Sequence, residues 1–442
     1  MDQAITEILD FVEENDIKFI RLQFCDIFGN IKNMSIMSSQ LKKAFLTGIS
    51  FDASSIDGFL NIEESDLFLF PDPSTLSILP WRPQQEKVAR FYCTIRRPNG
   101  ELFEGDSRMI LSKTIEELWR MGYTAKVGPE CEFYLFKTDE SGEPLLIPHD
   151  KAGYFDVAPV DKGENVRREV CLTLEQMGLV LESSHHESGP GQNEIDFKHD
   201  TGLISADNFI TAKIAIKTIA NLNGLYASFL PKPLKNESGS GFHINLSIAK
   251  DGKNLFKTDN EHSQEAESFI AGILDRLKEI TAILNPTVNS YKRFGSHEAP
   301  KYVTWSHKNR SQLIRIPAST GEYNRMELRS ADCTCNPYLA FTVLLQAGME
   351  GIREKKVLTK ATDVNLYKLD EKELEKYEKL PENLLEAIEE MEKSSFVRNI
   401  LGDFLFYKFI KAKKKEWADY KNNCKAEDDI SEWEIANYFY KI

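Results

Sequence analysis

Several features that define familiar classes of protein are missing from this sequence. No hydrophobic run approaches the roughly 18 residues that a membrane-spanning helix requires, so we expect no membrane partner. Residues 1–7 include two acids, Asp2 and Glu7, where a secretion signal carries basic residues. We therefore expect a cytoplasmic protein. A P-loop, Gly-x-x-x-x-Gly-Lys followed by Ser or Thr, is also missing, so any ATP is bound in another way.

Cysteine is scarce and scattered. The chain has seven, an odd number, and Cys333 and Cys335 form the only close pair. A zinc site of the common kind needs a second pair, and a disulfide framework needs regular spacing. We expect reduced cysteines that pack in the interior.

Basic residues are outnumbered by acids. Lys and Arg total 55 against 69 Asp and Glu, which gives a formal net charge of −14. Such a surface repels phosphate backbones, so we expect no nucleic-acid partner. The one basic run, residues 411–415, lies in a helical pattern beside acids and is typical of a solvated helix face. An excess of acids can also bind divalent cations, provided that the carboxylates converge.

The composition indicates a folded protein with more than one domain. The chain has 442 residues, of which 41% are hydrophobic and 28% are charged. Hydrophobic periodicity predicts a helix over residues 4–14, a hairpin over 20–36 and a strand over 88–95. Pro98-Asn-Gly100 is a turn signal, and we expect it to precede the boundary between a small domain, residues 1–103, and a large domain, residues 104–442.

The large domain is predicted to combine strands with long helices. Asp106 is a good N-cap for its first helix, and Gly122 is a suitable stop. Hydrophobic residues at helical spacing predict further helices over residues 164–177, 206–223, 264–284, 336–355, 381–400 and 402–421.

Four short segments alternate so that one strand face is polar and the other apolar, because successive side chains of a strand point to opposite faces. Any one of them could be an ordinary strand with one face in water. The polar faces, however, carry Glu, His and Arg, which favours a shared cleft. The segments are Glu130-Cys-Glu-Phe-Tyr-Leu135, Glu194-Ile-Asp-Phe-Lys198, His243-Ile-Asn-Leu-Ser247 and Arg325-Met-Glu-Leu-Arg329.

The residue types on these faces indicate a particular chemistry. Crowded carboxylates repel one another unless divalent cations neutralise them. Glutamate and histidine without thiolates suit magnesium or manganese better than zinc. Arginine suits phosphate or carboxylate groups, which it binds with two parallel hydrogen bonds. The residues alone therefore predict a metal-dependent enzyme that transfers phosphoryl groups to acids, and they leave its substrate open.

Several independent motifs are spread along the chain. They are Phe51-Asp-Ala-Ser-Ser-Ile56, Gly128-Pro-Glu-Cys-Glu-Phe133, His185-His-Glu-Ser-Gly-Pro-Gly-Gln-Asn-Glu194, Lys232-Pro-Leu-Lys-Asn-Glu-Ser-Gly-Ser-Gly-Phe-His243, Asn285-Pro-Thr-Val-Asn-Ser-Tyr-Lys-Arg293, Asn309-Arg-Ser311 and Arg325-Met-Glu-Leu-Arg329. In these motifs and in their order, over nearly its whole length, the sequence resembles the glutamine synthetase family, in particular the short bacterial and archaeal type I form.

The resemblance implies an α+β subunit with a small N-terminal β-grasp-like domain. The large catalytic domain would have a curved antiparallel sheet with helices outside it. It also implies ATP-dependent ligation of ammonia to the γ-carboxylate of glutamate through γ-glutamyl phosphate. Two or more Mg²⁺ or Mn²⁺ ions per site, and a dodecamer of two hexameric rings with sites shared between subunits, belong to the same expectation.

The same resemblance assigns residues to roles. For the metal nearer glutamate it implies Glu132, Glu187 and Glu194, and for the metal that binds the ATP phosphates Glu130, His243 and Glu327. For glutamate it implies Gly239, Arg293 and Arg329, where glycine leaves room for the substrate. For ATP it implies Glu182, Ser247, Arg310, Arg315 and Arg325, with Arg310 also catalytic.

The remaining assignments concern ammonium and the flap over the site. The resemblance implies that Asp52, Ser55 and Tyr154 bind ammonium, with Asp52 reaching the neighbouring subunit and removing a proton. It implies that Glu298 closes over glutamate, although this flap is one residue shorter than usual. Ala53 replaces a usual glycine and would be strained if φ there were positive.

Two alternatives stay open at this stage. One is a γ-glutamyl ligase that uses a larger amine, against which the retained ammonium site argues. The other is a catalytically silent homologue that senses nitrogen status, against which six intact metal-ligand positions argue.

Overall fold

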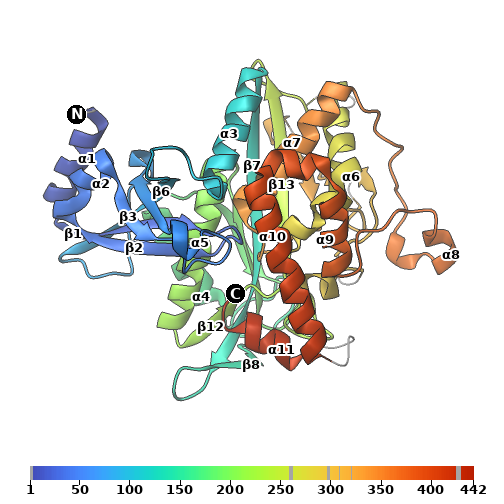
Figure 1. Cartoon of the computed structure of the whole chain (residues 1–442). Helices are drawn as coiled ribbons and strands as arrows, with labels where there is room; N and C mark the ends of the chain where they lie inside the picture. The colour runs from blue at the N-terminus through green and yellow to red at the C-terminus, as the bar shows by residue number, and fades with distance from the viewer. Residues whose placement is uncertain (1–2, 258–261, 296–298, 308, 320, 425–429) are drawn as a thin grey trace.

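The structure, a computed structural model, describes residues 3–257, 262–295, 299–307, 309–319, 321–424 and 430–442. Two sheets organise it, a small N-terminal one and a large one that contains the long strand β7 (Tyr123–Thr138). In Figure 1 the N-terminal sheet lies to the left of β7, and the helices α6 (Gln264–Leu284) and α9 (Leu384–Lys393) lie to its right. None of the described helices is both long and apolar enough to cross a membrane.

In the described residues, the N-terminal domain is a six-stranded sheet with two α-helices. The predicted hairpin forms around a turn in which the Asp26 carboxylate accepts hydrogen bonds from the backbone of Phe28 and Asn30. The sheet is mixed, because β1 pairs antiparallel with β2 and parallel with β6. The elements are α1 (Gln3–Glu14), β1 (Ile17–Cys25), β2 (Ile31–Met37), α2 (Leu41–Thr47), β3 (Ile49–Asp52), β4 (Asp66–Pro71), β5 (Ser77–Ile78) and β6 (Lys87–Arg96).

Over its described residues, the large domain contains a second sheet, of eleven strands. Its main path runs β15-β16-β17-β13-β7-β10-β9, and every pair along it is antiparallel except β15 with β16. The remaining strands are β8 (Pro144–Pro148), β9 (Leu181–His186), β10 (Gln192–Phe197), β11 (Asp200–Thr201), β12 (Leu225–Ser228), β13 (Phe242–Lys250), β14 (Lys253–Asn254), β15 (Trp305–His307), β16 (Ile314–Ile316) and β17 (Met326–Leu328).

Most predicted helices form near their predicted bounds, but the prediction over 381–400 is wrong. The chain leaves the helix at Ser394, whose side chain instead caps the next helix by accepting from Val397 N. Gly402 then breaks that helix with φ of 72°. The helices are α3 (Ser107–Arg120), α4 (Glu164–Gln176), α5 (Gly202–Leu222), α6 (Gln264–Leu284), α7 (Pro337–Glu354), α8 (Glu371–Leu374), α9 (Leu384–Lys393), α10 (Ser395–Asn423) and α11 (Glu432–Glu434).

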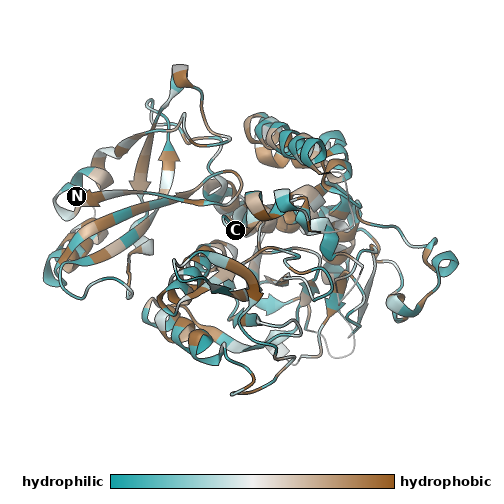
Figure 2. Cartoon of the chain, turned by 90° about the horizontal axis from the view of Figure 1, so that it is seen from below, coloured by the Kyte–Doolittle hydropathy of each residue, from teal (hydrophilic) through white to brown (hydrophobic). Residues whose placement is uncertain are grey.

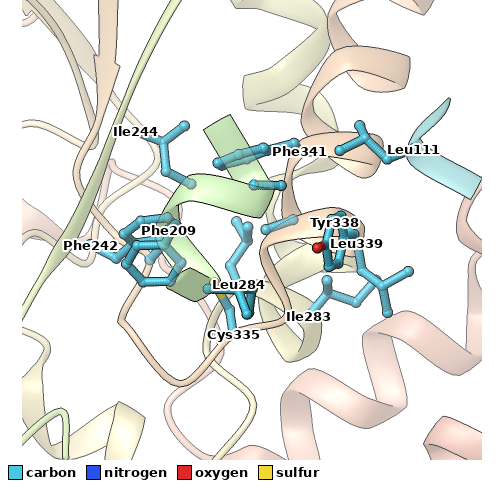
Figure 3. Packing of buried hydrophobic residues seen from close by; sticks show 14 of the residues in the cluster. Leu111, Phe209, Phe242, Ile244, Ile283, Leu284, Cys335, Tyr338, Leu339 and Phe341 are labelled. Atoms are coloured by element: carbon cyan, nitrogen blue, oxygen red, sulfur yellow. The ribbon is translucent and has the colours of Figure 1, made fainter. Parts of the chain in front are cut away.

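The core lies behind the large sheet, on the apolar face of its central strands. Phe242 of β13 packs against Phe209 of α5 and Phe341 of α7, with ring centroids 4.2 and 6.1 Å apart (Figure 3). Ile244 continues the same face of β13. Because helices cover this face, the opposite face of the strands is left to carry polar residues. Five of the seven cysteines are buried, and all seven are free thiols.

A partly buried ion-pair network joins the two domains. The Arg108 guanidinium at the start of α3 donates to both carboxylate oxygens of Asp207 on α5 and to Asp72 of the N-terminal domain. Tyr338 of α7 donates to the same Asp207 at 2.7 Å. Figure 2, seen from below, shows the N-terminal strands to the left of the large domain. We propose 103/104 as the domain boundary, after the turn at Gly100, whose φ is 88°.

Candidate active site

The four strands predicted to carry polar faces are consecutive neighbours in the large sheet, in the order β17, β13, β7, β10. Residues directly opposite each other on paired strands point to the same face. His243 lies opposite Glu130, and Glu194 lies opposite Glu132. The alternating pattern therefore brings the predicted ligands together on one surface.

This surface forms the floor of a cleft of about 700 Å³. Glu327 lies beneath it, fully buried on the same face. Predicted site residues make up much of the lining of the cleft. They are Glu130, Glu132, Tyr154, Glu187, Glu194, Gly239, His243, Arg293, Arg310, Arg315 and Arg329.

Glu130, His243 and Glu327 form one potential metal-binding group. Each offers a ligand atom, and these atoms lie within 4.8 Å of one another. The Nδ1 atom of His243 is 2.9 Å from a Glu130 oxygen and 3.8 Å from a Glu327 oxygen. Burial, followed by the charge of Arg329, lowers the pKa of His243 well below its usual value. The imidazole is therefore neutral, which is the form that binds metals.

Glu187 and Glu194 belong to a second group, in which His185 supplies the third potential ligand atom within 4.8 Å. Glu187 follows β9 and accepts from His185 Nε2 at 3.0 Å and from Ser188 N at 2.9 Å. Glu132 lies between the two groups. One of its oxygens is 3.7 Å from His243 Nε2, and the other accepts from Gly241 N at 2.7 Å.

The electrostatics of the cleft favour the binding of a cation. Burial and the charge of Glu187 raise the pKa of Glu132 to about 7. Burial and the charge of Glu132 raise the pKa of Glu194 well above its usual value, and burial also raises that of Asp196. One oxygen of Asp196 is buried and has no hydrogen-bond partner in the part of the chain that the structure describes. Carboxylates and a neutral imidazole without thiolates are a donor set that fits Mg²⁺ or Mn²⁺.

Three arginines lie among these acids. Arg315 of β16 and Arg329 each contact a different oxygen of Glu327. The buried Arg293 instead donates to backbone carbonyls of residues 329–331, and its Nε has no hydrogen-bond partner among the described residues. The described surroundings of Arg293 therefore leave capacity to bind an anionic substrate in the cleft.

The side chain of Arg293 passes so close to residues 239 and 241 that only glycine fits at these two positions. A Cβ atom on Gly239 would lie 2.5 Å from the carbonyl oxygen of Pro231 and 2.8 Å from Cγ of Arg293. A Cβ atom on Gly241 would lie 2.5 Å from a terminal nitrogen of Arg293 and 2.9 Å from His243 Nε2. Gly239 was predicted to leave room for substrate. The structure adds that it makes room for the arginine itself.

A smaller lobe of about 110 Å³ adjoins the cleft and shares Glu130 and Asp196 with it. The predicted nucleotide residues Glu182, Ser247 and Arg325 line this lobe. Arg325 Nε donates to Asn245 Oδ1 at 2.7 Å, and Asn245 donates in turn to Glu130. Hydrogen bonds thus link the lobe to the first potential metal group.

The residues predicted to bind ammonium lie at the rim of the cleft or outside it. Tyr154 is at the rim of the cleft, with its ring 5.5 Å from that of His185. Asp52 ends β3, and both it and Ser55 are exposed. No described residue lining the cleft or its lobe comes from the N-terminal domain. Hydrogen bonds from the Ser54 side chain and backbone lower the pKa of Asp52, so it stays ionised, as a cation ligand must.

Two further expectations concern loops. Glu298 falls outside the described residues, so its assignment stays a prediction. Ala53 is buried and donates its N–H to Ser65 O at 2.8 Å. It is not among the described residues with positive φ, so the strain foreseen for alanine there does not arise.

Sequence reasoning missed several residues of the cleft. Gln192 donates to both Glu132 and the carbonyl of Gly239, at 3.1 Å each. Asp196 lines both the cleft and the smaller lobe beside it. Both residues share the polar face of β10 with Glu194. The two-residue alternation already placed Asp196 on that face without giving it a role, and it could have found Gln192 in the same way. Gly241 could not have been found in this way, because its role depends on the position of Arg293.

Comparison with known proteins gives consistent results across the chain. The family model described as glutamine synthetase, catalytic domain, matches residues 104–438, and the one described as glutamine synthetase, beta-Grasp domain, matches residues 16–98. Curated relatives named glutamine synthetase include one from Clostridium saccharobutylicum, 47% identical over 98% of both chains. Another, from Methanosarcina mazei, is 48% identical over 98% of this chain and 97% of its own.

Solved structures are similar over the same extent. One titled "GmaS/ADP complex-Conformation 1" superposes with a TM-score of 0.86 at 28% identity, covering 98% of this chain and 99% of the other. A second, "Apo GmaS without ligand", has a TM-score of 0.85 at the same identity and coverage.

The fold and the cleft define an enzyme whose donor set suits divalent cations and anionic substrates. The chain belongs to the glutamine synthetase family. It has that family's β-grasp N-terminal domain and catalytic domain.

Proposed function

We propose that this chain makes glutamine in two steps. ATP phosphorylates the γ-carboxylate of glutamate, and ammonia then displaces phosphate from γ-glutamyl phosphate. One observation carries the proposal: four neighbouring strand faces gather acids, a neutral imidazole and arginines into one cleft. Relatives named glutamine synthetase, 44–48% identical over 98% of the chain, support the choice of substrate.

Six residues would hold two divalent cations, Mg²⁺ or Mn²⁺. Glu132, Glu187 and Glu194 would hold the one nearer glutamate. Glu130, His243 and Glu327 would hold the one nearer the ATP phosphates. When bound, such cations neutralise phosphate charge and polarise the groups that react.

Arginines would position glutamate and the transferred phosphoryl group. Arg293 and Arg329 suit the two carboxylates of glutamate, because a planar guanidinium binds a carboxylate with paired hydrogen bonds. Arg310 and Arg315 line the same cleft and suit the charge that develops on the phosphoryl group. Glu182, Ser247 and Arg325 in the adjoining lobe would bind the nucleotide.

Ammonium must be bound and deprotonated before it can attack. We assign this step to Asp52, Ser55 and Tyr154, with Asp52 supplied by a neighbouring subunit. The exposed, ionised Asp52 lies away from the cleft of its own chain, which supports such sharing. The enzyme would then be a homo-oligomer, for which we propose a cytoplasmic dodecamer of two hexameric rings.

A flap must keep water from γ-glutamyl phosphate until ammonia arrives. We assign this role to Glu298, which would also accept a proton from the tetrahedral adduct. The described residues on either side of this segment are joined by a hydrogen bond, which Gly295 N donates to the carbonyl of Ala299 at 2.7 Å.

One assay tests the proposal. Phosphate release and glutamine formation are measured with glutamate, ATP and Mg²⁺, comparing ammonium, methylamine, a polyamine and no acceptor. We expect ammonium to give the highest kcat/KM and one glutamine per phosphate. Preference for an amine would favour the alternative ligase activity. Absence of turnover with every acceptor would favour a non-catalytic role.

A further inference from the structure

A buried carboxylate in the C-terminal segment lies outside the roles assigned above. Glu434, the last residue of α11, has no exposed surface. One of its oxygens accepts from Asn289 Nδ2 at 2.9 Å. The other accepts from Lys292 Nζ at 2.5 Å and from the backbone and hydroxyl of Ser431.

Asn289 and Lys292, the described partners of Glu434 outside its own segment, belong to the short helix η4 (Asn289–Arg293), which ends in the proposed glutamate-binding arginine. Lys292 immediately precedes Arg293. Glu434 therefore fixes η4 at its first residue and at its fourth, one turn apart. The position of η4 in turn sets where the Arg293 side chain leaves the backbone.

A second loop of the cleft is attached to the same point. The side chain of Asn289 accepts from Lys232 N at 2.6 Å and donates to Lys232 O at 3.1 Å. Lys232 belongs to the loop that continues to Gly239, and its own ammonium group contacts the carbonyl of Glu237 in that loop. Asn289 thus connects Glu434 to both segments that would bind glutamate, the helix η4 and the loop from Lys232 to Gly239.

Helix capping alone does not account for this arrangement. Glu434 completes a capping box with Ser431. Glu373 completes the same motif with Asp370 at the start of α8 while remaining exposed. A capping box therefore does not require burial or a lysine partner. Burying an ion pair adds little stability over an apolar pair, because both charges lose water.

We propose that Glu434 is a positioning residue for the glutamate-binding side of the cleft. It fixes the position of η4 relative to the loop from Lys232 to Gly239, so that Arg293 and the backbone near Gly239 contact the same substrate. This inference rests on the proposed function, since it takes glutamate to be the molecule that these loops bind.

The test uses the full-length assembled protein and the variant Glu434→Gln, which keeps the size of the side chain and removes its charge. Glu373→Gln is the matched control, because it alters the same position of the exposed capping box. We expect KM for glutamate to rise about tenfold in Glu434→Gln, as expected for losing a charge-assisted contact that orients substrate. KM for ATP should stay within about twofold of the parent. The control should match the parent in both.

Substitutions of the two η4 residues that contact Glu434 provide a second test. Lys292→Met and Asn289→Ala should each raise KM for glutamate selectively, and adding Lys292→Met to Glu434→Gln should cause little further rise. If Glu434→Gln fails to assemble, these two variants carry the same expectation. A parental KM for glutamate in the assembled variants, or equal rises for glutamate and ATP, would overturn the proposal. A parent that forms no glutamine would overturn the proposed function instead.

Discussion

Glu132 and Glu194 lie directly opposite each other on β7 and β10, and both carboxylates are buried. Their charges repel in a region from which most water is excluded, so protonation is favoured in the absence of a cation. Burial and Glu187 raise the pKa of Glu132 to about 7, and burial and Glu132 raise that of Glu194. A cation between these strands would remove the repulsion.

This relationship predicts a pH-dependent affinity for Mg²⁺. The metal binds the ionised carboxylate, so affinity should be high above pH 7 and should fall as the pH drops through about 7. Binding near pH 7 should release protons. Calorimetry in two buffers of different ionisation enthalpy measures the number released. Glu132→Gln should release fewer protons, and equal release from both proteins would contradict the role of Glu132.

The same pKa shift predicts how Mg²⁺ changes thermal stability. A carboxyl whose pKa is raised by folding destabilises the folded protein once the pH exceeds the unfolded value, and the effect grows until about pH 7. Metal-free protein should therefore gain more from Mg²⁺ at pH 8 than at pH 5.5. At a Mg²⁺ concentration of 100 times the Kd at pH 8, the gain in the free energy of unfolding at that pH is about 2.7 kcal/mol. The same concentration should give a smaller gain at pH 5.5. Melting curves with EDTA or Mg²⁺ at both pH values measure it, and equal gains would argue against metal binding by these acids.

The sequence predicted the architecture of the site well, because two-residue alternation is set by the backbone itself. Glu130, His243, Glu194 and Glu327 were each placed on a polar strand face, and the strands proved to be neighbours. Alternation cannot reveal which strands pair, so convergence required the fold. The break at Ser394 was missed because hydrophobic spacing continues on both sides of the cap.

Residues that act through packing were beyond the sequence. Gly241 is required because Arg293 passes within 2.5 Å of where a Cβ would lie. Glu434 reaches η4 across more than 140 residues of chain separation. No local pattern encodes such contacts, since they depend on where distant segments meet.

Glu327→Ala should abolish turnover while the fold survives. Met326 and Leu328 supply the apolar side of β17 and are untouched, whereas the first potential metal group loses one ligand. We expect kcat to fall at least about 100-fold and nucleotide binding to weaken. Circular dichroism checks the fold. Glu327→Gln separates shape from charge and should be nearly as inactive. Parental turnover in either variant at saturating Mg²⁺ would refute the two-metal assignment.

The proposed sharing of sites between subunits predicts complementation. Asp52→Ala and Arg329→Ala proteins should each be nearly inactive. When they are unfolded together and reassembled, some sites combine an intact Asp52 from one subunit with an intact Arg329 from its neighbour, so activity should partly return. Differently tagged subunits, purified in sequence, show that mixed assemblies formed. Mixed assemblies without activity would place Asp52 in its own subunit's site or outside catalysis.

Breaking the domain junction should lower stability more than activity. Arg108 is the shared partner of Asp72 and Asp207, and removing it leaves Asp207 with a charge in a largely buried position. Arg108→Ala should lower the free energy of unfolding by about 3 kcal/mol. Arg398→Ala, which breaks an exposed pair with Asp403, is the control and should change it by less than about 1 kcal/mol. Chemical denaturation measures both values. An equal decrease in the free energy of unfolding for the two variants would show that Arg108 stabilises the protein no more than an exposed ion pair does.

The last prediction concerns Glu298. If this residue shields γ-glutamyl phosphate and accepts a proton from the adduct, Glu298→Ala should slow amide formation, because the proton loses its acceptor. The fraction of ATP hydrolysed without glutamine formation should rise, because water reaches the acyl phosphate. The ratio of phosphate released to glutamine formed, at saturating ammonium, measures both effects together with the rate. His307→Ala, on the exposed end of β15, is a surface control. If the ratio and the rate of Glu298→Ala both match the parent, the shortened flap does not act in catalysis, and another residue must exclude water from the intermediate.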